Sequence, residues 1–164
     1  MFIYILRHAI AVQRGTLAFP NDDRPLTDDG KDKMRKAARG MTTVVDKVDV
    51  ILTSPLVRAA DTAKIAGEAL SAEHAIEVCR ELLPGASAKK LLLYLAKYKN
   101  LDSIMIVGHE PDLGYLASAL LGSEQSIIEF KKGALCCIEV GSLPPRSPGT
   151  LVWHLQPKQL RDLK

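Results

Sequence analysis

An arginine and a histidine stand side by side where a short apolar segment of this chain ends. The segment Phe2–Leu6 consists of aromatic, β-branched and leucine side chains, which predicts a buried strand, and Arg7 and His8 follow it directly. Proteins with parallel sheets build ligand sites just beyond the carboxyl ends of their strands. A fixed cation beside an imidazole at such a place is suited to an anion, and phosphate fits this pair best.

Two later segments end in the same way. A second predicted strand at 48–52 leads into a predicted helix at 56–70, whose first turn carries Arg58, and a further strand at 103–107 is followed by His109. In a parallel sheet the carboxyl ends of the strands share one edge, so residues from distant parts of the sequence converge there. We therefore expect four cationic or potentially cationic side chains at one edge.

Taken together, these four side chains indicate one type of reaction. Without an anion they would repel one another, and two guanidinium groups match the oxygens of a phosphate. An imidazole can attack phosphorus and form a covalent phosphohistidine, while the arginines and the second histidine stabilise the charge on the remaining oxygens. The pattern predicts phosphoryl transfer with His8 as the nucleophile.

The elements that must position these residues alternate between strands and helices. A polar segment from His8 to Thr27 predicts a long loop, and the last quarter of the chain predicts strands joined by turns. We expect an α/β, three-layer fold with a mostly parallel sheet and antiparallel C-terminal edge strands, in one domain over residues 1–164. The remaining predicted helices are 28–41, 88–98 and about 112–121, and the remaining strands are 75–78, 127–130, 134–140 and 151–155.

Composition excludes several classes of protein. The chain is 47% hydrophobic and 25% charged with a net charge of +3, which is typical of an ordinary globular domain. Three cysteines, Cys79, Cys136 and Cys137, do not make a disulfide framework and are predicted to be buried thiols. No segment has the roughly 20 apolar residues of a membrane span, and no secretion signal is evident, so a cytoplasmic location and no membrane association are expected.

Three motifs together resemble the histidine phosphatase superfamily, which has the phosphoglycerate mutase-like fold. They are Leu6-Arg7-His8, the segment from Ser54 to Thr62, and Val107-Gly108-His109. Their order, spacing and structural context agree over most of the chain. The short length and the segment 24–30 are similar to the SixA-type phosphohistidine phosphatase branch.

This resemblance implies a role for each of the four residues. His8 would be the nucleophile, Arg7 and Arg58 would clamp the phosphate, and His109 would be the second histidine of the pocket. The superfamily usually has glycine after the nucleophile, and here the residue is Ala9. A methyl group there removes no group that the chemistry needs.

The general acid has the weakest signal in the sequence. Glu81 follows the third predicted strand, as the acid does in much of the superfamily, and Asp22 and Asp23 in the long loop are rivals. Arg24, in the same loop, is a candidate substrate contact. A leaving imidazole, with its reference pKa near 6.5, departs more readily than an alcohol and depends less on an acid. A poorly marked acid therefore favours phosphohistidine over a sugar phosphate as substrate.

The sequence thus predicts a metal-independent, cofactor-free phosphatase acting on phosphohistidine in a protein, such as a phosphocarrier or signalling-relay domain. The alternatives are a small-molecule phosphatase or mutase of the same superfamily and a non-catalytic phosphate-binding protein. A nucleic-acid-binding module is not favoured, because the basic residues are scattered and aromatic side chains for stacking are few. The turn lysines Lys131 and Lys132 are predicted to be surface charges or a secondary anion contact.

Overall fold

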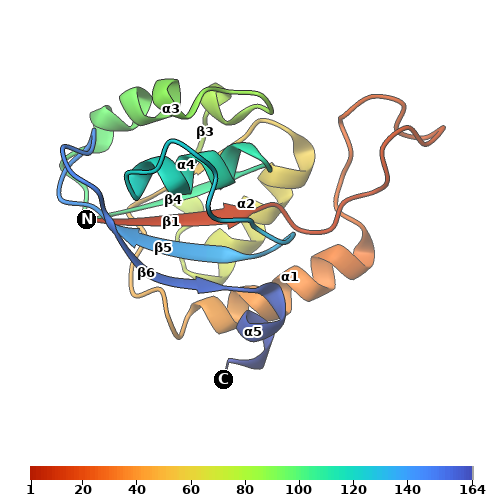
Figure 1. Cartoon of the computed structure of the whole chain (residues 1–164). Coiled ribbons are helices and arrows are strands. Elements are labelled where there is room, and N and C mark those ends of the chain that lie inside the picture. The colour runs from red at the N-terminus through yellow and green to blue at the C-terminus, as the bar shows by residue number, and fades with distance from the viewer. Residues whose placement is uncertain (164) are drawn as a thin grey trace.

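A computed structural model describes residues 1–163, and its centre is a six-stranded sheet in the order β3-β2-β4-β1-β5-β6 (Figure 1). The four parallel strands β1 to β4 alternate with helices, and two strands follow near the end. The strands are β1 Phe2–Arg7, β2 Val50–Thr53, β3 Ile76–Val78, β4 Ser103–Gly108, β5 Leu135–Glu139 and β6 Thr150–Leu155. The α-helices are α1 Asp28–Met41, α2 Val57–Ala69, α3 Ala88–Leu95, α4 Asp112–Leu120 and α5 Pro157–Asp162.

The sheet is parallel on one side of β1 and antiparallel on the other. β1 pairs with β4 in parallel, β4 with β2 and β2 with β3, whereas β5 runs antiparallel to β1 and β6 antiparallel to β5. This arrangement confirms the predicted mostly parallel sheet with antiparallel C-terminal strands. The carboxyl ends of β1, β2 and β4 therefore lie together at one edge.

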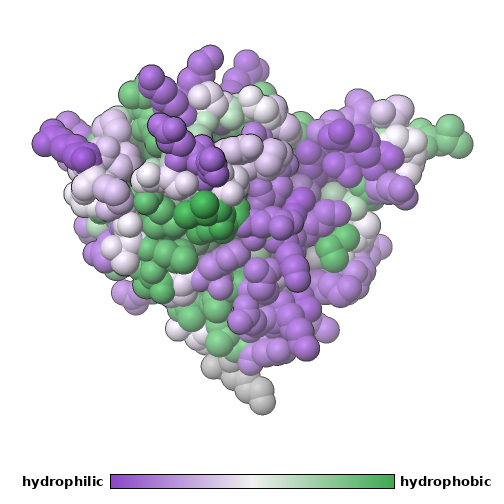
Figure 2. All heavy atoms as spheres, viewed as in Figure 1, coloured by the Kyte–Doolittle hydropathy of each residue, from purple (hydrophilic) through white to green (hydrophobic). Residues whose placement is uncertain are grey.

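Two layers of helices cover the two faces of the sheet. Helices α1, α2 and α5 bury side chains such as Met34, Ala63 and Leu160 against one face. Helices α3 and α4 bury leucines such as Leu95 and Leu116 against the other. Alternate residues of each strand supply the two cores, which is why the central strands are apolar without interruption. Figure 2 shows hydrophilic side chains over α1 and α5, and hydrophobic ones toward β5 and β6.

Helices α1 to α4 begin within about one residue of the starts that the sequence predicts. Thr27 caps α1, since its side-chain oxygen accepts a hydrogen bond from the Gly30 backbone N–H at 2.9 Å. Gly30 also has a second role, because a Cβ there would lie 2.0 Å from the carbonyl oxygen of Ile10. The long loop between β1 and α1 therefore packs directly on the first turn of α1.

Two expectations about the C-terminal part were wrong or incomplete. Residues 127–130 do not form a strand, because side chains take their backbone groups: Ser118 accepts from the Ile127 N–H at 2.8 Å, and Glu110 accepts from the Phe130 N–H. The short helix α5 was not predicted. It depends on a capping box at Gln156, and only Leu160 of its six residues is buried.

The predicted long loop from 8 to 27 is confirmed, because this segment contains no helix or strand. Its residues form only two isolated bridges, between Ala11 and Leu26 and between Thr16 and Phe19. Figure 1 shows this segment projecting from the edge of the sheet where β1 ends. The predicted helix at 88–98 is split into α3 and a 3₁₀ turn over Ala96–Tyr98, and two more 3₁₀ turns flank β3, at Glu73–Ala75 and Arg80–Leu82. Among the described residues, no helix has the length and apolar character needed to span a membrane.

Candidate active site

The parallel pairing of β1 with β4 places the two histidines of the site side by side. Arg7 lies opposite Gly108 in the ladder, and the N–H of His8 donates to the Gly108 carbonyl at 3.1 Å, which extends the pairing by one residue. The imidazole centroids of His8 and His109 lie 5.1 Å apart, at an interplanar angle of 55°. Both side chains are buried. The structure therefore brings together two histidines that are far apart in the sequence.

A single hydrogen bond fixes the protonation of the His8 ring. Nδ1 of His8 lies 2.8 Å from the carbonyl oxygen of Ala9. A carbonyl oxygen can only accept, so Nδ1 carries the hydrogen and Nε2 of the neutral ring keeps its lone pair. An imidazole in this tautomer has the nucleophilic nitrogen that attack on phosphorus requires.

Burial and neighbouring charges keep both histidines neutral. The pKa of His8 is lowered to about 3, mainly by burial; the hydrogen bond to Ala9 opposes this shift, and the neighbouring His109, Arg58 and Arg7 add to it. Burial also lowers the pKa of His109 to about 4, with Arg58 as the next cause. A protonated His8 could not attack, so this environment holds the ring in its reactive form at neutral pH.

Arg58 lies in the first turn of α2 with its guanidinium buried, and α2 ties it to the nucleophile. The Thr62 hydroxyl donates to the Arg58 carbonyl at 2.6 Å and accepts from the N–H of Ala9 at 3.0 Å. Thr62 is one helical turn after Arg58 and shares its face of the helix. This contact links the residue after the nucleophile to the helix that carries the arginine.

Arg7 is held from the opposite side by the segment before β5. Its Nη1 donates to the carbonyl of Phe130, whose N–H is bound in turn by the carboxylate of Glu110. Within residues 1–163, the buried Nε of Arg7 has no hydrogen-bond partner, and the same holds for Nε of Arg58. A phosphate in the pocket could accept hydrogen bonds from these two buried N–H groups, which otherwise lack a partner.

His109 is oriented by a serine at the end of the neighbouring strand. Its Nε2 lies 2.8 Å from the hydroxyl of Ser54, and the backbone N–H of Ser54 donates to the Val107 carbonyl at 3.0 Å. Ser54 and Thr62 entered the sequence prediction only as the two ends of the segment that resembles the superfamily, and neither was given a role in the site. The signal for Thr62 is its position one helical turn after Arg58, and the signal for Glu110 is its position directly after His109.

The loop carboxylates take different places. One carboxylate oxygen of Asp22 lies 3.0 Å from Nη2 of Arg58, while its other oxygen pairs with Arg14 at 3.0 Å. Partial burial would raise the pKa of Asp22, but hydrogen bonds from Arg58 and Arg14 hold it below its ordinary value. Asp22 therefore stays ionised and is unsuited to donate a proton. Asp23 is exposed and contributes only a backbone hydrogen bond to Asn21 at 3.3 Å.

Arg24 belongs to the same charged cluster but is occupied by the loop. Its guanidinium donates to the Val12 carbonyl at 2.7 Å and to the Asp22 carboxylate at 3.3 Å. Its charge helps to lower the pKa values of Arg58 and His109, so it lies within electrostatic reach of the pocket. The contacts support a role in shaping the loop.

Glu81 lies near the second histidine. It belongs to the 3₁₀ turn after β3, is half-buried, and shares the lining of a small cavity with His109. Its carboxylate accepts a hydrogen bond from the thiol of Cys79 at 3.4 Å. Of the three carboxylates considered as general acids, Glu81 shares a cavity with His109, whereas Asp22 is paired with Arg58.

Comparison with known proteins agrees with this geometry. The family model of the Histidine phosphatase superfamily (branch 1) matches residues 3–82. An uncharacterized protein of Picosynechococcus sp. is 32% identical over 145 residues, which cover 87% of each chain. The chain belongs to the histidine phosphatase superfamily. This histidine phosphatase is also 28% identical over 166 residues to the phosphohistidine phosphatase SixA of Escherichia coli, covering 100% of this chain and 99% of SixA.

Solved structures confirm the fold of this histidine phosphatase. The structure of the protein histidine phosphatase SixA complexed with tungstate has a TM-score of 0.83 at 28% identity, covering 98% of this chain and 99% of the other. The crystal structure of a protein from Agrobacterium tumefaciens that is assigned as a phosphohistidine phosphatase SixA has a TM-score of 0.79 at 22% identity, covering 95% of this chain and 97% of the other. The predicted phosphoglycerate mutase-like, three-layer fold is confirmed.

Proposed function

We propose that this histidine phosphatase removes phosphate from phosphohistidine on a protein through a phosphohistidine intermediate on His8. The observation that carries the proposal is the bond from Nδ1 of His8 to the Ala9 carbonyl, which leaves Nε2 unprotonated beside two arginines and a second histidine. The likeness to SixA and to its tungstate complex supports the same chemistry, because tungstate is a tetrahedral oxyanion like phosphate.

The reaction has two displacement steps at phosphorus. Nε2 of His8 attacks the phosphorus, a new N–P bond forms, and the N–P bond to the substrate imidazole breaks. The released electron pair returns to the leaving nitrogen, which takes up a proton from solvent. Water then attacks the phosphorus and gives up a proton to solvent as the new O–P bond forms, the N–P bond to His8 breaks with its electron pair returning to Nε2, and inorganic phosphate leaves. Arg7, Arg58 and His109 stabilise the charge on the phosphoryl oxygens in both steps.

The position of Glu81 separates two classes of substrate. An alkoxide leaving group needs a general acid, and we assign that role to Glu81 because it lies in the cavity beside His109. A leaving imidazole needs this acid less, because its conjugate acid has a pKa near 6.5. Glu81 is therefore expected to matter for ester cleavage more than for phosphohistidine.

The short connections at this edge favour a substrate that is itself a protein. Only three residues join β2 to α2, and only three join β4 to α4. The longer loop between β1 and α1 projects from the sheet edge. Such an edge admits a phosphorylated side chain presented by another domain.

We also propose a cytoplasmic location, which is supported by three buried cysteines that are unpaired.

Three proteins test the proposal: the wild type, His8→Ala and Glu81→Gln. Each is assayed on a protein phosphorylated on histidine and on an aryl phosphate. We expect His8→Ala to lose activity on both substrates by at least about 10³-fold, since the nucleophile is gone. We expect Glu81→Gln to lose ester cleavage while keeping most of its activity on phosphohistidine.

Trapping the intermediate distinguishes turnover from binding. Rapid quenching of wild type with ³²P-labelled substrate should give acid-labile, alkali-stable label on His8 and none in His8→Ala. Full activity of His8→Ala would overturn the mechanism. Efficient hydrolysis of small esters with phosphohistidine proteins untouched would instead support the small-molecule phosphatase, and the absence of both covalent label and phosphate release would support a non-catalytic binding protein.

A further inference from the structure

A cavity of about 160 Å³ lies next to the nucleophile but outside the catalytic cluster. Ala9 and Ile10, which follow His8, form one wall, and Gly133, whose N–H donates to the Arg7 carbonyl at 3.1 Å, forms another. The cavity therefore opens at the same edge of the sheet as the catalytic residues, on the side of α1 and α5. Among the residues that the structure describes, none of the four catalytic side chains lines it.

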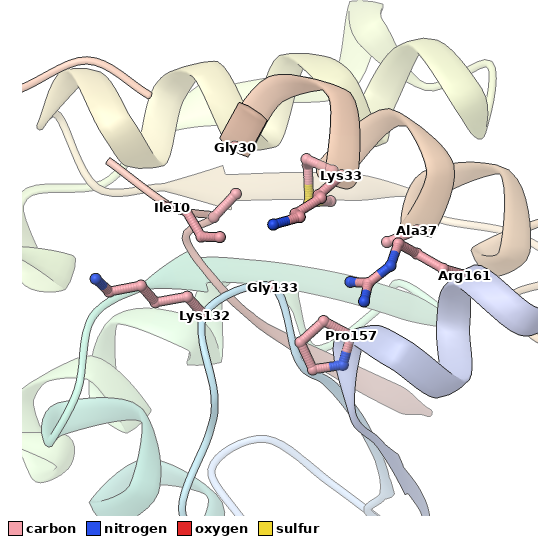
Figure 3. A pocket seen from close by; sticks show the side chains of 10 residues that line it. Ile10, Gly30, Lys33, Ala37, Lys132, Gly133, Pro157 and Arg161 are labelled. Atoms are coloured by element: carbon pink, nitrogen blue, oxygen red, sulfur yellow. The ribbon is translucent and has the colours of Figure 1, made fainter. Parts of the chain in front are cut away.

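The floor of this cavity is apolar and its rim is basic. Met34, Ala37 and Pro157 supply apolar surface, while Lys33, Lys132 and Arg161 supply three cations, and no carboxylate of residues 1–163 lines the cavity. Figure 3 shows the side chains of Lys33 and Arg161 reaching toward the cavity from α1 and α5. We call this feature the basic cavity.

The cations of the rim are not all neutralised within the chain. Lys33 pairs with Asp29 at 2.8 Å. In the described part of the chain, Lys132 and Arg161 make no salt bridge with a carboxylate. Two unpaired cations beside an apolar floor favour an occupant that carries both an apolar group and negative charge.

The size of the basic cavity identifies the kind of occupant. Sites for drug-sized ligands measure roughly 300–1,000 Å³. An apolar cavity of about 150 Å³ accommodates a benzene-sized group. A space of this size suits one apolar side chain of a protein, and buried side chains in pockets are the usual anchors of protein interfaces.

We propose that the basic cavity is a docking site for the substrate protein, receiving one apolar side chain flanked by carboxylates. This inference rests on the proposed function, because a substrate that presents phosphohistidine to His8 must cover the adjacent edge of the sheet. The anchor holds the substrate domain while its phosphohistidine enters the catalytic cluster. The basic rim attracts the acidic surface and sets its orientation.

Charge reversal at the rim tests the docking site. Lys132→Glu and Arg161→Glu are compared with the wild type on a histidine-phosphorylated protein with acidic residues around its histidine, and on an aryl phosphate. We expect each reversal to raise KM for the protein substrate by about tenfold with kcat unchanged. The kinetics on the aryl phosphate should stay the same, because that substrate does not reach the cavity.

Two further variants complete the test. Lys99→Glu makes the same change in charge at an exposed site before β4, at the opposite edge of the sheet, and should leave both substrates unaffected. Ala37→Leu enlarges a buried side chain of the floor and should raise KM for the protein substrate alone, and its unfolding curve checks that the core around α1 accepts the larger side chain. The wild-type KM for the protein should also increase with salt, since the rim attraction is screened.

The outcomes separate this inference from the proposed function. Equal KM values in the wild type and in both reversals would overturn the docking site, as would equal losses on both substrates. Loss of a dimer in the reversed variants would identify the cavity as an interface between copies and would also overturn it. If the wild type leaves the phosphoprotein intact, the proposed function fails, and direct binding of the same domain to wild type and variants then decides the docking site.

Discussion

A carboxylate oxygen of Asp22 lies 3.0 Å from Nη2 of Arg58, and Nη1 of the same guanidinium donates to the Asp22 backbone carbonyl at 2.8 Å. Asp22 thus occupies both Nη groups of the guanidinium, so a phosphate that binds Arg58 at two points must take one of them in addition to the unpartnered Nε. The carboxylate must yield to the phosphoryl group or share the guanidinium with it. The Asp22 carboxylate therefore competes with phosphate for the guanidinium of Arg58.

Asp22→Asn should strengthen the binding of oxyanions. The substitution removes the negative charge while leaving the backbone contact to Arg58, so the inhibition constant for inorganic phosphate should fall about two- to fivefold, in keeping with a partly exposed ion pair. Competitive inhibition of aryl phosphate hydrolysis measures it. Asp23→Asn, at an exposed carboxylate one residue later, is the matched control. Weaker phosphate inhibition in Asp22→Asn would mean that Asp22 positions Arg58 for phosphate.

The two buried histidines should make the protein less stable in mild acid. Both have a folded-state pKa below the unfolded value of about 6.5, so below that pH the unfolded chain binds protons that the folded chain does not. The stability that these neutral, buried histidines contribute is fully present above about pH 6.5. The free energy of unfolding then decreases as the pH falls toward the pKa values of the folded state. Each histidine adds up to about 1.4 kcal/mol per pH unit to the slope.

Urea unfolding between about pH 7 and 5 measures this slope. His8→Asn should flatten it by up to one proton, because one of the two groups is removed. The exposed His74 lies outside the cluster, so His74→Asn is its control. An unchanged slope in His8→Asn would show that His8 is protonated in the folded state.

Thr62→Val should cost both stability and activity. The side chain is fully buried and joins Ala9 to the first turn of α2, so valine would leave a buried N–H without a partner. We expect a loss of about 1–3 kcal/mol in the free energy of unfolding and a lower kcat, since Ala9 also holds Nδ1 of His8. Thr42→Val, at the exposed end of α1, should change stability by less than about 0.5 kcal/mol. An intact kcat in Thr62→Val would show that the contact serves the fold alone.

Ser54→Ala should lower kcat with little change in KM. The serine does not bear a charge that binds phosphate, but its hydroxyl lies 2.8 Å from Nε2 of His109 and orients that ring. We expect a loss of about tenfold, the lower end of what removing a residue that supports a functional histidine costs. A change confined to KM would contradict this role, and the unfolding curve of the variant checks that the fold is intact.

The convergence of the four catalytic-cluster residues could be predicted from the sequence because each residue lies at or just after the end of a strand in a parallel sheet. Once alternating strands and helices imply a parallel sheet, Arg7, His8 and His109 are expected at one edge, and the pairing of β1 with β4 in the structure then places them side by side. Arg58 follows from the first turn of α2 by the same reasoning. The prediction needed only strand ends, which hydrophobic periodicity marks well.

The contacts that tune the cluster were not predictable, because they come from segments without periodicity. Nothing in the loop sequence states that Asp22 reaches Arg58. The segment 127–130 has the composition of a strand, yet its backbone is bound by the side chains of Ser118 and Glu110. Tertiary hydrogen bonds there replaced the pairing that local composition favoured.

The central place of β1 has a consequence for the newly made chain. Phe2 pairs with Ser103 on one side and with Glu139 on the other, so β1 pairs only with strands that lie far along the chain from it. Until β4 emerges, the nucleophile has neither its second histidine nor the dry surroundings that keep it neutral. The four residues of the catalytic cluster therefore come together only when these long-range strand pairings have formed, so the site is completed late in folding.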